Sequence, residues 1–218
     1  MVQESVHLTQ DSEYTFKSKL KKPIKNNYLL LKRTFDVVLC SFLLFTVLPL
    51  IGLTMLFIRL ESSGKVIYSQ NRVGYMGHIF KIYKLRSMVS NAEKDGKAVW
   101  AVKNDVRITR VGRFIRKTRI DELPQLLNVI RGDMSLIGPR PERPEFTEKF
   151  SLEYPGFEQR LRVKPGLTGF AQINGGYELN PQKKATLDMK YINTLNFKFD
   201  LKIFVETFKI IFTGDGAR

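Results

Sequence analysis

The chain has 218 residues and a mass of 25.2 kDa, the size of one domain with a short appendage. Its 36 Lys and Arg residues outnumber 21 Asp and Glu residues, and the net charge of +15 predicts an anionic partner: a nucleic acid, a membrane surface or a phosphorylated substrate. One cysteine and two histidines exclude an intrachain disulfide framework and a cysteine-cluster metal site, so that carboxylates, hydroxyls, lysines and arginines must carry any chemistry.

Residues 1–27 are polar, lack helical or strand periodicity, and contain a basic run from Lys17 to Lys25. This composition predicts a basic flexible tail near an anionic surface. The segment is not typical of a cleavable signal, because the apolar run starts too late and no small-residue cleavage site follows it.

Residues 37–58 contain no charged side chain. As a straight helix this stretch would be about 33 Å long, enough to cross a hydrocarbon core of about 30 Å. The alternative is a buried helix of a soluble core, which is usually shorter and polar on one side. Pro49 removes a backbone donor and clashes with the preceding turn, so the sequence predicts a kink there.

Basic residues flank this apolar run on both sides, with Lys32 and Arg33 before it and Arg59 and Lys65 after it. Since basic flanks favour the cytoplasmic side, a helix that enters the membrane, breaks and returns to the same face would satisfy both flanks. A spanning helix is the alternative, and charge symmetry alone leaves both open. Asp36 is expected to pair with Lys32 or Arg33 at the membrane edge.

A small β-hairpin is predicted next, from two β-rich segments at residues 65–74 and 78–86. Its candidate core residues are Phe80, Ile82 and Tyr83. Lys84 and Arg86 alternate along the second strand and project to one side, where a solvated edge is the simpler interpretation. Residues 89–104 are polar and predict a helix or a loop, in which Trp100 packs or lies at the membrane interface.

Arginine then recurs at every third position, as Arg107, Arg110, Arg113, Arg116 and Arg119. On a helix this spacing places several guanidinium groups on one broad face, and such groups match phosphate oxygens in two-point contacts. A solvated or headgroup-facing helix is the simpler interpretation. The adjacent acidic pair Asp121 and Glu122 favours phosphate chemistry, although Asp121 could also cap the next helix, with Pro124 in its first turn.

Three prolines at positions 139, 141 and 144 predict an extended loop that holds Arg140, Glu142 and Arg143 with little entropic cost. A structural turn is the alternative. Residues 164–169 carry further turn signals.

The stretch from Asp188 to Phe212 predicts a helix with one apolar stripe, made of Phe197, Leu201, Phe204, Phe208 and Ile211. Such a stripe more often packs into a core. Beside a membrane anchor, an in-plane interfacial helix is the rival interpretation.

Several mechanisms are excluded, because the chain has no Walker-type phosphate loop, no dinucleotide fingerprint and no Ser-His-Asp arrangement. The remaining features indicate phosphoryl chemistry at a bilayer surface. A carboxylate can attack phosphorus to form an acyl phosphate, and arginine or a divalent cation can stabilise the developing charge. Hard oxygen ligands favour Mg²⁺.

Six segments together resemble the bacterial sugar transferase family, the monotopic phosphoglycosyl transferases that start polysaccharide and glycan assembly. They are residues 32–36, 71–74, 80–88, 118–125, 132–141 and 164–169. The resemblance runs in order from about Lys32 to the end. Large members of the family add four membrane helices before this domain, so the chain resembles the short, catalytic-domain-only form.

The resemblance implies transfer of a sugar 1-phosphate from a UDP-sugar to polyprenol (undecaprenyl) phosphate, with release of UMP. Asp121 would be the nucleophile, forming a covalent phosphosugar intermediate, and would lie against Mg²⁺, with Glu122 assisting. The other implied site residues are Arg116 and Arg140 on the phosphates, Lys84, Arg86 and Glu142 nearby, and Asp188 at a further acidic position. The reaction would initiate capsule, exopolysaccharide or glycan assembly at the cytoplasmic face of the bacterial inner membrane.

The expected fold is α+β and mostly helical, with a Pro-broken re-entrant membrane helix, a small β-hairpin and in-plane interfacial helices. The expected division is a basic flexible tail at 1–27, the re-entrant helix at 28–60 and a cytoplasmic catalytic domain at 61–218. The residues that define the membrane segment are Lys32, Arg33, Asp36 and Pro49.

Two other functional classes remain open at this point. One is a membrane-anchored nucleic-acid-binding or adaptor module, whose binding would weaken steeply with salt. The other is a non-catalytic scaffold in which Asp121 only caps a helix. The expected partners are UDP-sugar, polyprenol phosphate and membrane lipid, without nucleic acid, and the sugar, the polymer and homo-oligomer formation are left open.

Overall fold

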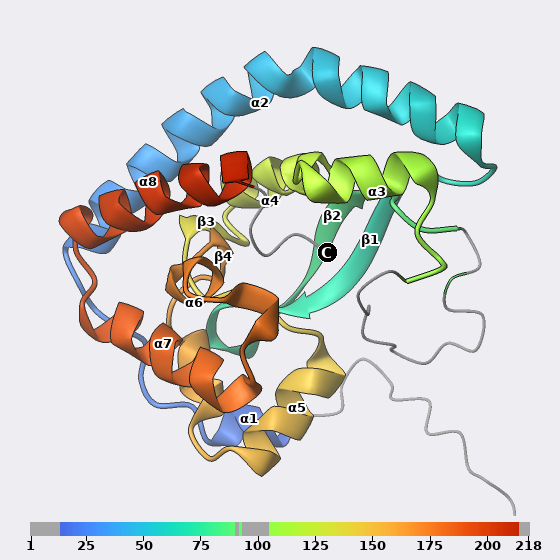
Figure 1. Cartoon of the computed structure of the whole chain (residues 1–218). Coiled ribbons are helices and arrows are strands. Elements are labelled where there is room, and N and C mark those ends of the chain that lie inside the picture. Colours follow the sequence, from blue (N-terminus) through green and yellow to red (C-terminus); the bar gives the residue numbers. More distant parts are fainter. Residues whose placement is uncertain (1–13, 90–91, 93–104, 214–218) are drawn as a thin grey trace, which may run out of the picture.

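A long apolar helix arches over a smaller α+β body in the computed structural model of the chain (Figure 1). The structure describes residues 14–89, 92 and 105–213. Most of the predicted polar stretch 89–104, Trp100 included, therefore lies outside the described residues. The described part confirms a mostly helical α+β fold, and it contains two small sheets where the sequence predicts one hairpin.

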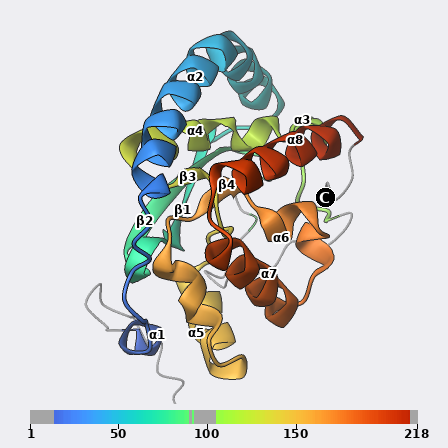
Figure 2. The ribbon, with the colours of Figure 1, turned by 90° about the vertical axis from the view of Figure 1, so that its left-hand side faces the viewer.

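Helix α2 (Tyr28–Glu61) contains Pro49 and is the one helix among the described residues that is long and apolar enough to cross a membrane. Only 11% of its most apolar window is buried, which argues against a helix of a soluble core. Large apolar side chains stand exposed along it, among them Leu31, Phe35, Val38, Phe42, Phe45, Leu53 and Leu60. Figures 1 and 2 show both ends of the arch descending to the same body.

The N-terminal end of α2 is bound to the body by buried polar contacts. Lys32 Nζ lies 2.6 Å from Asp200 Oδ2. Asp36 accepts hydrogen bonds from Ser135 Oγ at 2.6 Å and from the Leu136 backbone N–H at 3.3 Å. The predicted ion pair of Asp36 with a neighbouring cation is therefore wrong, because Lys32 finds its carboxylate on another helix.

Arg33 also turns toward the body rather than toward Asp36. Its guanidinium donates to the carbonyl oxygens of Val129 and Ile130, at 2.5 and 2.8 Å. These carbonyls belong to the end of helix α4 (Leu126–Arg131), where a cation is favourable.

Of the flexible tail predicted at 1–27, residues 1–13 lie outside the described residues, and residues 14–27 do not form such a tail. Helix α1 (Thr15–Ser18) buries Phe16 completely, in a cluster with Val73 and Leu161. Further along, Arg162 Nε donates to the Lys22 carbonyl at 2.8 Å. The apolar contact of Phe16 and these backbone contacts hold the segment on the body, which a charge pattern alone does not reveal.

The hairpin is confirmed as strands β1 (Ile67–Val73) and β2 (Ile79–Leu85), which pair antiparallel around the turn η1 (Tyr75–Gly77). Phe80 and Ile82 are buried core residues, whereas Tyr83 is only half-buried. Met76 and Gly77 have φ angles of 51° and 79°, which accounts for the glycine.

A second sheet was not predicted, because its short strands lie in the two segments where proline and glycine indicate loops or turns. Strand β3 (Ser135–Ile137) pairs parallel with β4 (Gly166–Thr168). Three glycines let these backbones approach closely: a Cβ on Gly166 would lie 2.1 Å from Gly138 N, and one on Gly169 would lie 2.0 Å from Gly138 O.

The arginine run does not form one helix. Helix α3 (Arg110–Lys117) ends before Arg119, which adopts a left-handed conformation with φ 60°, and the 3₁₀ helix η2 (Ile120–Gln125) follows. Since Arg107 lies before the helix and Arg119 after it, only the three central arginines share a helical surface.

The remaining helices build the lower part of the body and one side of its upper face. They are α5 (Pro144–Glu153), η3 (Phe157–Arg162), α6 (Phe170–Ile173), η4 (Gly176–Glu178), α7 (Pro181–Asn193) and α8 (Phe197–Thr213). The single helix predicted for 188–212 is thus two, separated at residues 194–196.

The apolar stripe of α8 packs into the core only in part: Phe204 lies against the core cluster, whereas three other members of the stripe are exposed. Phe197, Leu201 and Phe208 are 51%, 49% and 42% exposed, whereas Ile203 of the same helix is fully buried. Both views place α8 and α3 on the side of the body that faces α2 (Figures 1 and 2). An exposed stripe beside an apolar anchor favours the in-plane interfacial interpretation.

Candidate active site

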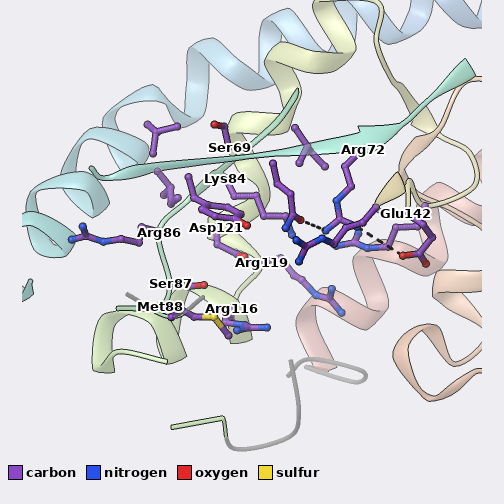
Figure 3. Close-up of a pocket in the computed structure, with 18 of the residues that line it drawn as sticks. Ser69, Arg72, Lys84, Arg86, Ser87, Met88, Arg116, Arg119, Asp121 and Glu142 are labelled. Carbon is purple, nitrogen blue, oxygen red and sulfur yellow. Dashed lines mark hydrogen bonds and ion pairs between the residues drawn. The ribbon is translucent and has the colours of Figure 1, made fainter. Parts of the chain in front are cut away.

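A cavity of about 640 Å³ lies between the hairpin and the elements from α3 to α7 (Figure 3). Basic side chains dominate its described lining: Lys65, Arg72, Lys84, Arg86, Arg107, Arg116, Arg119, Arg140, Arg143, Arg160 and Lys184. The acidic residues of that lining are Asp121 and Glu142. A concave site with this charge balance is suited to a ligand that carries several negative charges.

Strand alternation explains how the hairpin contributes. Tyr68 and Lys84 are register partners, as are Gln70 and Ile82, and all four line the cavity. Because side chains at every second position share a face, this face of the hairpin forms one wall. The predicted projection of Lys84 to one side is confirmed, and that side is the cavity rather than a solvated edge.

Asp121 lies within η2, two residues beyond the left-handed Arg119. It is 7% exposed and lines the cavity. Burial raises the pKa of its carboxyl to about 6; Lys84 opposes this rise, Glu122 adds to it, and Arg116 and Arg140 oppose it. No hydrogen bond or ion pair to its carboxylate occurs among the residues that the structure describes.

The predicted N-cap role of Asp121 is wrong. The residue is inside the 3₁₀ helix, whose N-cap position belongs to Arg119, and no side chain caps that helix by a hydrogen bond. The carboxylate is therefore not engaged by the backbone of the helix that follows. This removes the geometric basis of a purely structural scaffold role.

Glu122 is held in the opposite way to its neighbour. Its carboxylate accepts from Lys84 Nζ at 2.7 Å and forms an ion pair with the Arg140 guanidinium. Burial would raise the pKa of Glu122, but the charges of Arg140 and Lys84 outweigh it and hold the pKa well below its usual value. Glu122 is thus a fixed anion that orients two cations beside Asp121.

Arg116 and Arg119 complete the basic lining near Asp121, one from the last turn of α3 and one from the bend after it. Arg110 and Arg113 do not line the cavity. Arginine at every third position therefore predicted the correct residue type for the cavity wall. It predicted only some of the arginines that line the cavity, because helix α3 ends at Lys117.

Arg86 lines the cavity, but its guanidinium is directed away from Asp121 (Figure 3). It donates to the carbonyls of Ser63 and Ser62, at 2.8 and 2.7 Å, and to that of Ile58 at 3.3 Å. These contacts are at the end of α2. The phosphate-binding role implied for Arg86 stays a prediction, and its contacts favour a structural role.

Of the other predicted acidic residues, Glu142 lines the far end of the cavity, and Asp188 lies beside Arg160, which lines it. Glu142 lies 3.8 Å from Arg72 Nη1 and 3.6 Å from Lys184 Nζ. Asp188 is almost fully buried outside the lining and pairs with Arg160 at 2.7 Å. Burial raises the pKa of Asp188 to about 6, although Arg160 opposes the rise.

Sequence reasoning missed three cations at this end. Arg72 lies in a segment that was assigned to the hairpin without a role in the site, and strand alternation with Lys84 could have identified it. Arg160 and Lys184 lie outside every segment that carried the resemblance. Only the tertiary fold brings them beside Glu142 and Asp188.

The donor set is compatible with one magnesium ion held mainly by substrate. No group of three acidic, histidine or cysteine side chains that could hold a metal occurs within residues 14–89, 92 and 105–213. Asp121 nevertheless offers a cavity-lining carboxylate without a protein partner in that part of the chain. Mg²⁺ is commonly bound through one or two carboxylates together with substrate phosphates and water.

Comparison with known proteins places these features in a family. The model of the family described as bacterial sugar transferase matches residues 27–214. A Bacillus subtilis protein, provisionally named as an undecaprenyl-phosphate N-acetylgalactosaminyl 1-phosphate transferase, is 60% identical over 62% of this chain and 74% of its own length.

Two further relatives extend the similarity over most of the chain. The UDP-N-acetylgalactosamine-undecaprenyl-phosphate N-acetylgalactosaminephosphotransferase of Aeromonas hydrophila is 44% identical over 92% of this chain and 47% of its own length. The UDP-glucose:undecaprenyl-phosphate glucose-1-phosphate transferase of Caulobacter vibrioides is 44% identical over 85% of this chain and 71% of its own length. The chain thus spans about half of one relative and about three quarters of the other two.

Proposed function

This chain belongs to the bacterial sugar transferase family and is a transferase, and from that premise we propose that it moves a sugar 1-phosphate from a UDP-sugar to undecaprenyl phosphate. UMP is the second product. The proposal extends to this chain the activity by which its relatives are named.

The observation that carries the proposal is the contrast between two adjacent carboxylates. Glu122 is engaged by Lys84 and Arg140, whereas Asp121 faces the arginine-lined cavity with no cation bound to it in the described part of the chain. A nucleophile must be accessible to the phosphorus atom, and positioned cations must stabilise the phosphoryl oxygens. Asp121 meets the first requirement and its neighbours meet the second.

The reaction then proceeds in two displacements. A carboxylate oxygen of Asp121 bonds to the phosphorus that carries the sugar, and the bond from that phosphorus to the UMP oxygen breaks. An oxygen of undecaprenyl phosphate next bonds to the same phosphorus, and the Asp121 carboxylate leaves. Arg116 and Arg140 stabilise charge on the phosphoryl oxygens in both steps.

Mg²⁺ would be held by Asp121 together with the donor phosphates, and when bound it neutralises charge on the diphosphate. Lys84 and Arg140 hold the Glu122 carboxylate next to Asp121 by ion pairs. The pKa of Asp121, about 6, leaves its carboxyl group mostly ionised at neutral pH, as a nucleophile must be.

N-acetylgalactosamine is the sugar that the relatives favour. The 60% identical relative and one of the 44% identical relatives are both named for it, whereas others are named for glucose or galactose. UDP-N-acetylgalactosamine is therefore the first donor to test.

The same structure supports a re-entrant membrane segment with both ends on the cytoplasmic face of the inner membrane. Lys32 at one end of α2 pairs with Asp200 of the body, and Arg86 of the body donates to carbonyls at the other end. A helix whose two ends bind one water-soluble body cannot pass straight through a bilayer. In intact cells, an impermeant thiol reagent should label neither Lys25→Cys nor Ser63→Cys; labelling of one alone would establish a spanning helix.

The function is tested with the full chain in detergent, undecaprenyl phosphate, Mg²⁺ and separate UDP-sugars. UMP release is expected, fastest with UDP-N-acetylgalactosamine. In the absence of undecaprenyl phosphate, a donor labelled in the sugar should leave label on the wild-type polypeptide but not on Asp121→Asn. UMP release without any labelled polypeptide would retain the transferase and exclude the covalent intermediate.

A further inference from the structure

The C-terminal end of α2 is bound to the strand that carries Lys84. Arg86, two residues further along, is 7% exposed and donates to the Ser62 carbonyl, the Ser62 hydroxyl and the Ser63 carbonyl at 2.7–2.9 Å. The Arg86 backbone N–H also donates to the Val66 carbonyl at 2.9 Å. One buried guanidinium therefore joins β2 to the last turn of the apolar helix.

The same helix end is bound to α3, which carries Arg116. The Glu61 carboxylate accepts the backbone N–H of Arg110 at 2.7 Å and that of Val111 at 3.1 Å. These are two of the unsatisfied donors in the first turn of α3, where a negative charge is favourable. Glu61 does not line the cavity.

An apolar cluster lies between these two polar connections. Ile51 and Ile58 of α2 are buried against Leu85 of β2 and Ile115 of α3. Ile120 and Leu123, which flank the Asp121–Glu122 pair, pack against the same cluster. The floor of the catalytic segment is thus formed by the C-terminal part of the membrane helix.

We propose that residues 51–62 of α2 are a positioning element of the active site: through Arg86, Glu61 and the apolar cluster they hold Lys84, Arg116 and Asp121 in register. The inference rests on the proposed function, since turnover is its readout. Arg86 and Glu61 are positioning residues and do not contact the substrate. An error of about 1 Å in such an arrangement can cost about a hundredfold in rate.

If residues 51–62 of α2 only position the active site, their disruption should slow the chemical step and leave binding of the UDP-sugar nearly unchanged. The remaining basic side chains of the cavity still bind the diphosphate when the helix end shifts. Loss of Arg86 or Glu61 should therefore lower kcat while the KM for the UDP-sugar and inhibition by UMP change little. A direct phosphate contact by Arg86 would instead raise the KM and weaken UMP inhibition.

The experiment compares Arg86→Gln, Arg86→Lys and Glu61→Ala with a matched control, Arg59→Gln, in the full chain. Arg59 is an exposed arginine at the same helix end; within the described part of the chain its side chain donates only to the Gly64 carbonyl, at 3.2 Å, and it does not line the cavity. We expect kcat to fall about tenfold or more in Arg86→Gln and Glu61→Ala, less in Arg86→Lys because its ammonium can still reach a carbonyl, and not at all in Arg59→Gln.

Limited trypsin digestion supplies a readout that does not depend on activity. Lys65 follows the segment that Arg86 holds, so Arg86→Gln should be cleaved after Lys65 faster than wild type or Arg59→Gln. If Arg86→Gln is too unstable to purify, Glu61→Ala still decides. A wild-type kcat in Glu61→Ala would overturn the proposal, and so would a raised KM with unchanged kcat in Arg86→Lys. Absence of UMP release by the wild-type protein would instead overturn the proposed function.

Discussion

The two ends of the cavity contain the same residue types and use them differently. At one end Glu122 is engaged by two cations, and Asp121 has none among the described residues. At the other end Asp188 pairs with Arg160 at 2.7 Å, and Glu142 lies within 4 Å of Arg72 and Lys184. The difference indicates that paired carboxylates build the site, while the carboxylate without a partner is available to react.

The largest expected effect is on Asp121. Asp121→Asn should reduce UMP release by more than about a thousandfold, since loss of a nucleophile removes the covalent path. Its thermal unfolding temperature should remain at or above that of wild type, because the substitution removes a buried charge that has no partner among the described residues. Substantial residual turnover in Asp121→Asn would contradict the assignment of Asp121 as the reacting carboxylate.

The next effect concerns stability at the other end. Arg160→Met leaves Asp188 buried without its cation and should destabilise the protein by about 3–5 kcal/mol, measured by denaturant unfolding in detergent. The double variant Arg160→Met/Asp188→Leu should recover a large part of this loss. If the double variant is as unstable as the single one, packing rather than charge pairing holds this end together.

A smaller effect is expected from pH. The pKa of Asp188 is raised by burial to about 6 from an ordinary value of 3.8, so the folded state binds its proton more tightly than the unfolded state does. The stability that Asp188 contributes below pH 3.8 is therefore lost as the pH rises through about 6, by up to about 3 kcal/mol. Comparing the unfolding free energy of wild type and Asp188→Asn across this range should show that this part of the pH dependence disappears in the variant.

The smallest effect is expected from removing an exposed charge away from the cavity, which serves as a control for the other substitutions. Lys149 and Glu153 form an exposed pair of helix α5 at 3.8 Å, away from both ends of the cavity. Lys149→Met should change the unfolding free energy by less than about 0.5 kcal/mol and leave UMP release unaltered. A larger change would mean that charge removal in general, and not its place at the cavity, explains the preceding results.

Local patterns in the sequence predicted several elements of the fold and of the cavity wall. The uncharged run identified α2, alternation identified the hairpin and the direction of Lys84, and the prolines identified the loop that carries Arg140 and Glu142. Each of these features depends on residues close together in the chain.

Features that depend on distant contacts could not be predicted in this way. Strands β3 and β4 have three residues each, and their register partners, such as Ser135 and Gly166, are 31 positions apart. The contacts of Arg86 could not be predicted, because its partners are backbone carbonyls at the end of another element. The stripe of α8 was left open between the core and the membrane interface, since periodicity identifies an apolar face but not what covers it.

The close approach of β3 and β4 has a consequence for how this chain can vary. At Gly138, Gly166 and Gly169 a methyl group would meet backbone atoms of the neighbouring segment at 2.0–2.5 Å, and backbone cannot move aside as a side chain can. A saturation mutagenesis library screened for UMP release should therefore reject nearly every substitution at these three positions, as firmly as at Asp121. Intolerance there would report lost shape of the loop that carries Arg140, not lost chemistry.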